Sequence, residues 1–329
     1  MRLYLVSLNG MQPFFMNKGK RTMAERWKGI VLWGTGLENM AHKTDPLQMK
    51  NASEGWLADI RGFGPWQTMT MLPEGAESRC WRSSGSTDGV PLVLTGRCSS
   101  VMDLAWHFIQ QEWLPEWGSV LALSQWSGRG QLGREWISPG GNIYGALRIP
   151  LLSPSWANLI SLLTGHALIR SFAQAGVEIK LKWPNDLVHE NKKVGGILIE
   201  EKGNAIIAGI GINLNSAPPS GALRSDHAIA AASLSEFGCN FTPLSLWREL
   251  MNHFRSIFEN TLLTLTPSAF TGELQADLAF LGEKIRVDEG HRRAYEATVA
   301  GISHNGGLIL KTDEGLKAIR SGSICYIRA

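Results

Sequence analysis

The sequence has few of the features that mark membrane, secreted or nucleic-acid-binding proteins. It has only four cysteines in 329 residues and no C-x-x-C pair. Neither a disulfide framework nor a zinc site is therefore expected, and reduced thiols in a cytoplasmic protein are the better interpretation. No apolar run approaches the roughly 20 residues that cross a bilayer, so a membrane is not an expected partner. The 32 basic residues nearly balance the 29 acidic ones, which does not indicate a dedicated nucleic-acid-binding protein.

The composition instead indicates a folded chain with a substantial core. Hydrophobic residues make up 44% of the chain and charged residues 19%, and 13 tryptophans are present, which excludes a largely disordered protein. The length allows two or three domains. Many of the 36 glycines lie inside short apolar segments, where glycine indicates a sharp turn or a close approach of the backbone to another group.

Residues 1–97 differ from the rest and are expected to form an N-terminal extension of unknown role. Glycine and proline recur irregularly, and no helical or strand periodicity is sustained. A basic run from Lys18 to Lys28 is typical of a solvated surface or of a nucleic-acid arm. No helix-turn-helix pattern accompanies this run.

Residues 98–281 are expected to form a mixed α/β domain. Alternating apolar segments predict strands, and Ser-Pro or Thr-Pro pairs predict where helices begin. A strand at 91–95 precedes this range, and the expected strands within it are 119–125, 142–150, 177–182, 194–200 and 205–214. The expected helices cover 102–113, run from Ser153 to near Gly176, and start at Thr242 and Thr266.

Residues 282–329 consist of short alternating segments separated by glycine-containing turns. Five such segments in this range predict a small β-barrel. With the mixed domain before it, this barrel makes the expected fold class α+β.

The segment 128–136, Gly-Arg-Gly-Gln-Leu-Gly-Arg-Glu-Trp, carries the strongest chemical signal. Closely spaced glycines leave backbone N–H groups accessible to an anion, and Arg129 and Arg134 supply planar donors suited to phosphate or carboxylate. An ordinary hairpin with solvated arginines would have the same composition. The segment matches neither the P-loop nor the dinucleotide-binding pattern, so a dehydrogenase is not favoured.

Three further segments place polar groups where strands begin or end. Residues 182–187 are Lys-Trp-Pro-Asn-Asp-Leu, residues 193–200 are Lys-Val-Gly-Gly-Ile-Leu-Ile-Glu, and residues 211–215 are Gly-Ile-Asn-Leu-Asn. Each also has a purely structural explanation, as a tight turn, a surface lysine or turn-capping asparagines. Jointly they indicate a ligand with a charged phosphate end and an apolar body, lying between glycine-rich strands.

In this order and spacing, the four segments resemble the bacterial biotin–protein ligases over residues 91–329. The resemblance implies a mixed-sheet catalytic domain of the biotin/lipoate ligase type over 98–281 and a small SH3-like barrel over 282–329. Residues 1–97 do not match the winged helix that many relatives carry. Repression, and with it DNA as a partner, is therefore not expected.

The resemblance also implies which residues hold the substrates. Biotin would contact Ser100, Val101, Met102, Gln125, Arg129, Gly130, Gln131, Lys193 and Gly196, and ATP would contact Gly128, Arg134, Asn185 and Asn213. Val101 and Met102 replace hydrogen-bonding side chains of the family and can offer only backbone or apolar contacts. Gln131 replaces a frequent arginine, which removes a positive charge from the loop expected to close over activated biotin.

The implied catalytic residues are Lys193, Arg134 and Asp186. Lys193 would bind the biotin carboxylate as it attacks the α-phosphate of ATP, Arg134 would face the phosphates, and Asp186 would orient the acceptor amine. No resident metal motif is present, and Mg²⁺ is expected to arrive with ATP near Asp186. The product, biotinyl-5′-AMP, would then react with a lysine of a biotin carboxyl carrier domain, the expected partner. Homodimerisation is compatible with the resemblance.

Three alternatives fit parts of the sequence. A lipoate–protein ligase would share the fold and the adenylation chemistry, but the resemblance implies that it lacks the Gly-Arg-Gly-x-x-Gly-Arg loop. A biotin-sensing DNA-binding regulator would use the basic run at residues 18–28 as its arm. A biotin-binding scaffold without turnover is disfavoured because Lys193 and Arg134 are present.

Overall fold

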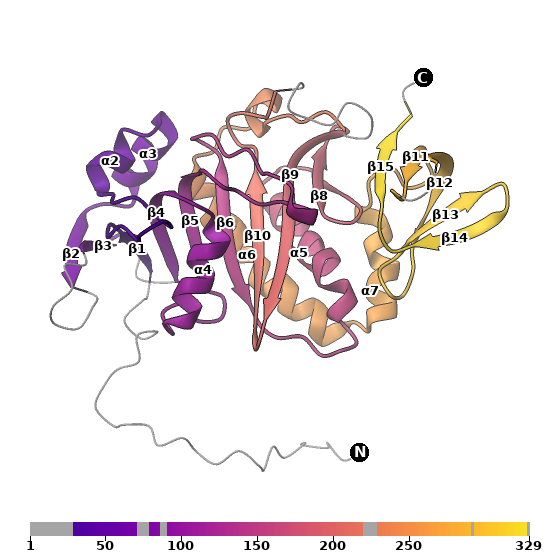
Figure 1. The fold of residues 1–329 in the computed structure, drawn as a ribbon, viewed down its shortest axis with the longest axis horizontal. Helices are drawn as coiled ribbons and strands as arrows, with labels where there is room; N and C mark the ends of the chain where they lie inside the picture. Colours follow the sequence, from indigo (N-terminus) through magenta and orange to yellow (C-terminus); the bar gives the residue numbers. More distant parts are fainter. Residues whose placement is uncertain (1–28, 71–78, 86–90, 220–228, 291–292, 328–329) are drawn as a thin grey trace, which may run out of the picture.

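The computed structural model describes residues 29–70, 79–85, 91–219, 229–290 and 293–327. These residues form a mixed ten-stranded sheet and a five-stranded antiparallel sheet at the C-terminal end (Figure 1). The larger sheet has the order β2-β3-β1-β4-β5-β6-β10-β9-β8-β7. Its strands are β1 (Ile30–Trp33), β2 (Trp66–Thr70), β3 (Arg79–Ser83), β4 (Leu92–Cys98), β5 (Ser119–Gln125), β6 (Ile143–Ile149), β7 (Lys180–Lys182), β8 (Asp186–His189), β9 (Lys192–Lys202) and β10 (Ala205–Ile212). The predicted α+β class is confirmed.

Helices cover both faces of the ten-stranded sheet. α4 (Val101–Gln110) packs on one face, whereas α5 (Ile160–Gln174) and α6 (Pro243–Thr264) pack together on the other. In β1, Ile30 and Leu32 join the core of α5 and α6, while Val31 and Trp33 join the core of α4. Because both faces are covered, this strand is apolar along its whole length.

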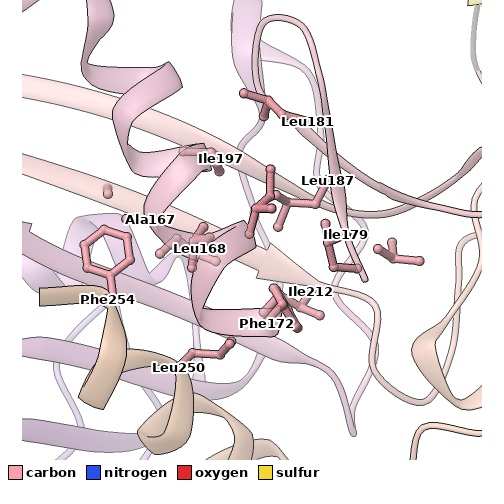
Figure 2. Packing of buried hydrophobic residues seen from close by; sticks show 14 of the residues in the cluster. Ala167, Leu168, Phe172, Ile179, Leu181, Leu187, Ile197, Ile212, Leu250 and Phe254 are labelled. Carbon is pink, nitrogen blue, oxygen red and sulfur yellow. The ribbon is translucent and has the colours of Figure 1, made fainter. Parts of the chain in front are cut away.

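The core around α5 supports the sheet from one side. Figure 2 shows side chains of α5 packed among residues of the sheet and of α6; the labelled residues are Ala167, Leu168, Phe172, Ile179, Leu181, Leu187, Ile197, Ile212, Leu250 and Phe254. All of them are buried. Dense packing of this kind holds side chains in fixed rotamers, so β8, β9 and β10 form a rigid support.

The described part of residues 29–97 continues the same sheet. β1 pairs in parallel with β4 and antiparallel with β3, and β3 pairs with β2. The boundary expected at residue 97 falls inside β4, and α2 (Pro46–Lys50) and α3 (Glu54–Gly62) lie beside this end of the sheet (indigo in Figure 1). The sequence shows no clear period here because β1, β2 and β3 are only four or five residues long. The basic run at residues 18–28 lies outside the described residues.

A buried carboxylate of α3 ties this segment to the first residues of α6. Asp59 accepts hydrogen bonds from the Thr242 hydroxyl and from the backbone N–H groups of Leu244 and Ser245. Asp59 thus caps α6 across the fold, a function that the Thr242 side chain itself does not perform. Burial raises the pKa of the Asp59 carboxyl, and the three hydrogen bonds oppose this increase.

The helix expected from Ser153 begins later than its sequence indicates. Ser153 and Pro154 form a turn, a short 3-10 helix follows over Ala157–Leu159, and α5 starts at Ile160. The Ser153 hydroxyl pairs with the Ser155 hydroxyl at 2.9 Å, so it does not cap a helix. The strand expected over 177–182 is also shorter, since β7 contains only Lys180–Lys182.

The C-terminal sheet confirms the predicted small β-domain (yellow in Figure 1). Its strands are β11 (Lys284–Asp288), β12 (Tyr295–Ile302), β13 (Leu308–Thr312), β14 (Gly315–Ile319) and β15 (Ser323–Tyr326), and α7 (Pro267–Glu273) precedes them. The Trp183 indole N–H donates to the Gly306 carbonyl at 3.0 Å, and the Ala279 N–H donates to the Leu181 carbonyl at 2.9 Å. These bonds fix the turn after β7 against this domain.

None of the helices in the described ranges has the length and apolar character needed to span a membrane.

Candidate active site

A cavity of about 780 Å³ lies between the glycine-rich parts of β9 and β10 and the segment 128–136, which we call the cavity loop. The first turn of α4, the turn after β7, and Gly322 and Ser323 of the C-terminal domain complete its wall. The predicted site residues in this wall are Ser100, Val101, Met102, Gln125, Arg129, Gly130, Gln131, Arg134, Asn185, Asp186, Lys193, Gly196 and Asn213. The fold therefore brings together residues from five separate segments, whose individual roles are still predictions.

The closure of the cavity loop explains why residue 128 is a glycine. Gly128 is not among the residues that line the cavity. A Cβ atom at Gly128 would lie 2.4 Å from the Trp136 carbonyl oxygen and 2.7 Å from the Ser138 hydroxyl. The Trp136 N–H donates to the Gly128 carbonyl at 2.9 Å. The close approach of the two loop ends therefore requires glycine at this position.

One end of the cavity is polar because of Ser100 and Gln125. Ser100 is buried and caps α4, where its hydroxyl accepts a bond from the Met102 N–H at 3.3 Å. The Gln125 carboxamide oxygen accepts a bond from the Val101 N–H at 2.8 Å, and its nitrogen donates to the Ser138 hydroxyl at 2.9 Å. Val101 thus contributes its backbone N–H to the polar end of the cavity, and the two hydrogen bonds hold the Gln125 amide in one orientation.

The floor of the cavity consists of three strand glycines covered by two apolar side chains. A Cβ atom at Gly211 would lie 2.6 Å from the Trp136 ring, and one at Gly196 would lie 3.1 Å from it. A Cβ atom at Gly209 would lie 2.7 Å from the Met102 sulfur. These three glycines let the indole and the thioether lie directly on the strands, which leaves a flat apolar channel for a ligand.

Two lysines and one aspartate form a charged cluster in the wall of the cavity. The Lys182 Nζ lies 2.7 Å from one Asp186 carboxylate oxygen, and the Lys193 Nζ lies 2.6 Å from the other. Burial alone would raise the pKa of Asp186, but the two ammonium groups outweigh it and lower this pKa to about 2. The Lys193 ammonium also lies 5.2 Å from the centre of the Trp136 ring. Asp186 is therefore a permanent anion, and Lys193 stands at the end of the apolar channel.

The predicted nucleotide residues hold the backbone around this cluster. The Asn185 amide donates to the Ile197 carbonyl at 2.6 Å, and the Ile197 N–H donates to the Asn185 carbonyl at 2.9 Å. Asn213 is only 3% exposed, and its amide donates to the Ala232 carbonyl at 3.2 Å. Arg134 is exposed on the cavity loop and faces the cavity, so it is the cation that can move toward an incoming anion.

Sequence reasoning did not assign a role to four residues that shape this cavity: Lys182, Trp136, Asp103 and Glu200. Lys182 and Trp136 lie within motifs that were recognised, and Glu200 ends the segment 193–200. Asp103 follows Met102 in the first turn of α4 and pairs with Arg129 of the cavity loop at 2.7 Å. Such pairings join segments far apart in the chain, so the signal could only have been the presence of charged residues inside each motif.

Over the described ranges, no group of three or more histidine, cysteine or acidic side chains could hold a metal ion. In the cavity, both carboxylate oxygens of Asp186 already accept from lysine ammonium groups. The donor set therefore does not fit a magnesium site of the protein's own.

Comparisons with known proteins agree with this geometry. A model of the biotin/lipoate A/B protein ligase family matches residues 95–216, and a model of the biotin protein ligase C-terminal domain matches residues 280–325. The biotin–[acetyl-CoA-carboxylase] ligase of Paracoccus denitrificans is 31% identical over 222 residues, which cover 63% of this chain and 89% of that protein. The bifunctional ligase/repressor BirA of Bacillus subtilis is 28% identical over 228 residues, which cover 66% of this chain and 69% of that protein.

Solved structures show the same relationship. The biotin protein ligase of Aquifex aeolicus, in complex with biotin and ATP, superimposes with a TM-score of 0.58 at 25% identity. The match covers 72% of this chain and 99% of that chain.

Proposed function

The chain belongs to the biotin protein ligase family, and on this premise we propose that its cavity aligns biotin along the glycine floor with the carboxylate at Lys193. The protein is an ATP-dependent ligase that activates biotin and transfers it to a carrier protein. The observation that carries the residue assignment is the Lys193 ammonium, which lies at the end of an apolar channel and 2.6 Å from Asp186. The tail of biotin is an alkyl chain that ends in a carboxylate. It therefore matches an apolar channel that ends at an ammonium group.

In the first step, the biotin carboxylate attacks the α-phosphate of ATP and pyrophosphate leaves. Lys193 turns from Asp186 to the biotin carboxylate and neutralises charge in the transition state. Lys182 stays bound to Asp186, so the buried carboxylate keeps a counter-ion throughout this exchange. Arg134 approaches the phosphates from the cavity loop.

In the second step, the amine of a carrier lysine attacks the mixed anhydride and AMP leaves. With Lys182 still bound, Asp186 remains ionised and is a weak base at neutral pH. Asp186 therefore attracts and orients the incoming ammonium group, which loses its proton to solvent before attack. The carrier domain of a biotin-dependent carboxylase is the proposed acceptor.

We propose that magnesium arrives on the ATP phosphates, because Asp186, the carboxylate at the lysine cluster, already has an ammonium group on each oxygen. When bound, magnesium offsets phosphate charge. The chain's own contribution to this charge balance comes from Lys182, Lys193 and Arg134, with Asp186 as the counter-charge.

Biotin-dependent exchange of labelled pyrophosphate into ATP tests this function without an acceptor. The chain is expected to catalyse exchange with biotin, and not with lipoate or octanoate run in parallel. Exchange with lipoate instead of biotin would transfer the proposal to the lipoate ligases of the same fold. Absence of exchange with all three acids would refute the proposed chemistry.

Gly211→Ala tests the position of the apolar channel. The added methyl group would lie 2.6 Å from the Trp136 ring and would push the indole into the space proposed for the biotin tail. The KM for biotin is expected to rise about tenfold. Gly140→Ala is the control, since nothing lies within 4 Å of that position. Equal KM values for the two variants would place the biotin tail elsewhere.

Gln131→Arg tests the charge of the cavity loop. An arginine at this position would add a cation beside the adenylate, and the release of free biotinyl-AMP is expected to slow about two- to fivefold. Trapping of the released adenylate with hydroxylamine measures this rate. Gln131→Met reports the effect of side-chain shape without charge, and an equal rate for the arginine and methionine variants would contradict the electrostatic explanation.

A further inference from the structure

Arg129 of the cavity loop is bound by two carboxylates that come from different elements. One guanidinium nitrogen lies 2.7 Å from an Asp103 oxygen in α4, and another lies 3.1 Å from a Glu200 oxygen in β9. The planar guanidinium can bridge two acceptors in this way, whereas an ammonium on a flexible stem cannot hold the same fork. The loop is thereby attached to both the helix and the strand that form the cavity wall.

Both carboxylates are themselves held in place. The second oxygen of Glu200 accepts a hydrogen bond from the Trp106 indole at 2.7 Å and lies 3.6 Å from the Lys202 ammonium. The second oxygen of Asp103 lies 3.4 Å from the Ser99 hydroxyl. The acidic pair is therefore organised before Arg129 binds to it, which reduces the entropy that binding loses.

The position of Arg129 in the loop makes this attachment important. The neck of the loop is closed by the bonds from Gly130 N–H to the Arg134 carbonyl, at 2.7 Å, and from Trp136 N–H to the Gly128 carbonyl. Arg129 lies in this neck, whereas Leu132 at the tip is 88% exposed. Fixing Arg129 therefore fixes the base about which the tip can move.

We propose that Asp103 and Glu200 are positioning residues that latch the neck of the cavity loop through Arg129 and so slow the escape of the adenylate. In this arrangement Arg129 faces two negative charges and is not a free phosphate ligand, which leaves Arg134 as the loop's cation for ATP. The retention of the adenylate rests on the proposed function, whereas the attachment of the loop does not.

Asp103→Asn and Glu200→Gln test the latch, alone and combined, with Glu201→Gln as the control on the same strand. Glu201 is exposed and lies next to Glu200. Limited trypsin cleavage after Arg129 or Arg134 reports loop opening without any substrate. AMP formation from biotin and ATP without acceptor reports adenylate escape.

Each single variant is expected to increase both rates about two- to fivefold, and the double variant more. The control is expected to match the wild type. Cleavage rates equal to wild type in all latch variants, or a rise of the same size in Glu201→Gln, would overturn the latch. Faster cleavage with unchanged AMP formation would overturn its role in retention. If the wild type itself makes no AMP from biotin, the proposed function fails, and the trypsin comparison still decides whether the latch exists.

Discussion

Lys193→Ala is expected to lower the rate of biotin-dependent pyrophosphate exchange by about 10²–10³-fold. The ammonium group is the cation proposed to meet the biotin carboxylate, and alanine leaves the attacking carboxylate without charge compensation in a partly enclosed cavity. The measurement is the exchange rate at saturating ATP over a range of biotin concentrations. A rate close to wild type would remove Lys193 from the reaction.

The loss of activity should not come from unfolding. The structural bonds of Lys193 are made by its backbone, whose N–H donates to the Ala230 carbonyl and whose carbonyl accepts from the Ala232 N–H. Asp186 also keeps Lys182 as a partner when Lys193 is replaced. Lys192→Ala is the matched control, because the neighbouring ammonium lies near the Phe237 ring. Its exchange rate is expected to equal that of the wild type.

Asp59→Ala is expected to lower the free energy of unfolding by about 2–3 kcal/mol. Alanine leaves the Thr242 hydroxyl and the N–H groups of Leu244 and Ser245 without their acceptor at a buried helix end. Urea unfolding followed by tryptophan fluorescence measures this loss. Asp45→Ala is the control, since Asp45 caps the short helix α2 at the surface through one bond to the Gln48 N–H, and about 1 kcal/mol is expected.

Asp59 makes the free energy of unfolding depend on pH, and the sign of this dependence follows from its pKa. Because its pKa is raised in the folded state, the folded chain binds more protons than the unfolded chain between 3.8 and the folded pKa. Stability therefore falls as pH rises through this window. Asp59→Asn cannot ionise and is expected to lack this fall, so the stability of the wild type relative to this variant should rise as pH falls. Because Asp59 joins α3 to α6, the segment around α3 is expected to unfold together with the rest of the chain. A separate unfolding transition for this segment would contradict that expectation.

The sequence predicted the central elements well where local signals and tertiary packing agree. The strand over 119–125 follows from a short continuous apolar run, and the five C-terminal strands follow from alternating apolar residues between turns. The helix start at Ser153 was predicted wrongly because Ser-Pro is equally suited to a turn. The first strands had no readable period because they are only four or five residues long, and β1 is held in place by pairing with β4, about sixty residues further along the chain.

The site residues, like the helices and strands, could be predicted from the sequence only where the signal is local. Glycine motifs identify where another group approaches the backbone closely because a missing Cβ is visible in the sequence, as at Gly196, against which the Trp136 ring lies. The partners of charged groups are set by which elements meet in space, so neither the Asp103–Arg129 pair nor the bridging position of Asp186 could be derived from spacing. Gly128 illustrates a related difficulty, because a glycine required for loop closure looks identical to one that contacts a ligand.

The bonds between the turn after β7 and the C-terminal domain limit how freely the two domains could be exchanged between relatives. Residues 278–281 run beside β7, where Leu278 bridges in parallel with Leu181, and Trp183 in the cavity turn relies on the Gly306 carbonyl. A chimera with a foreign domain over 282–329 would have to reproduce the Gly306 contact, or the turn that carries Asn185 and Asp186 would lose this support. Two domains that can be recognised separately in sequence thus depend on each other for the geometry of this turn.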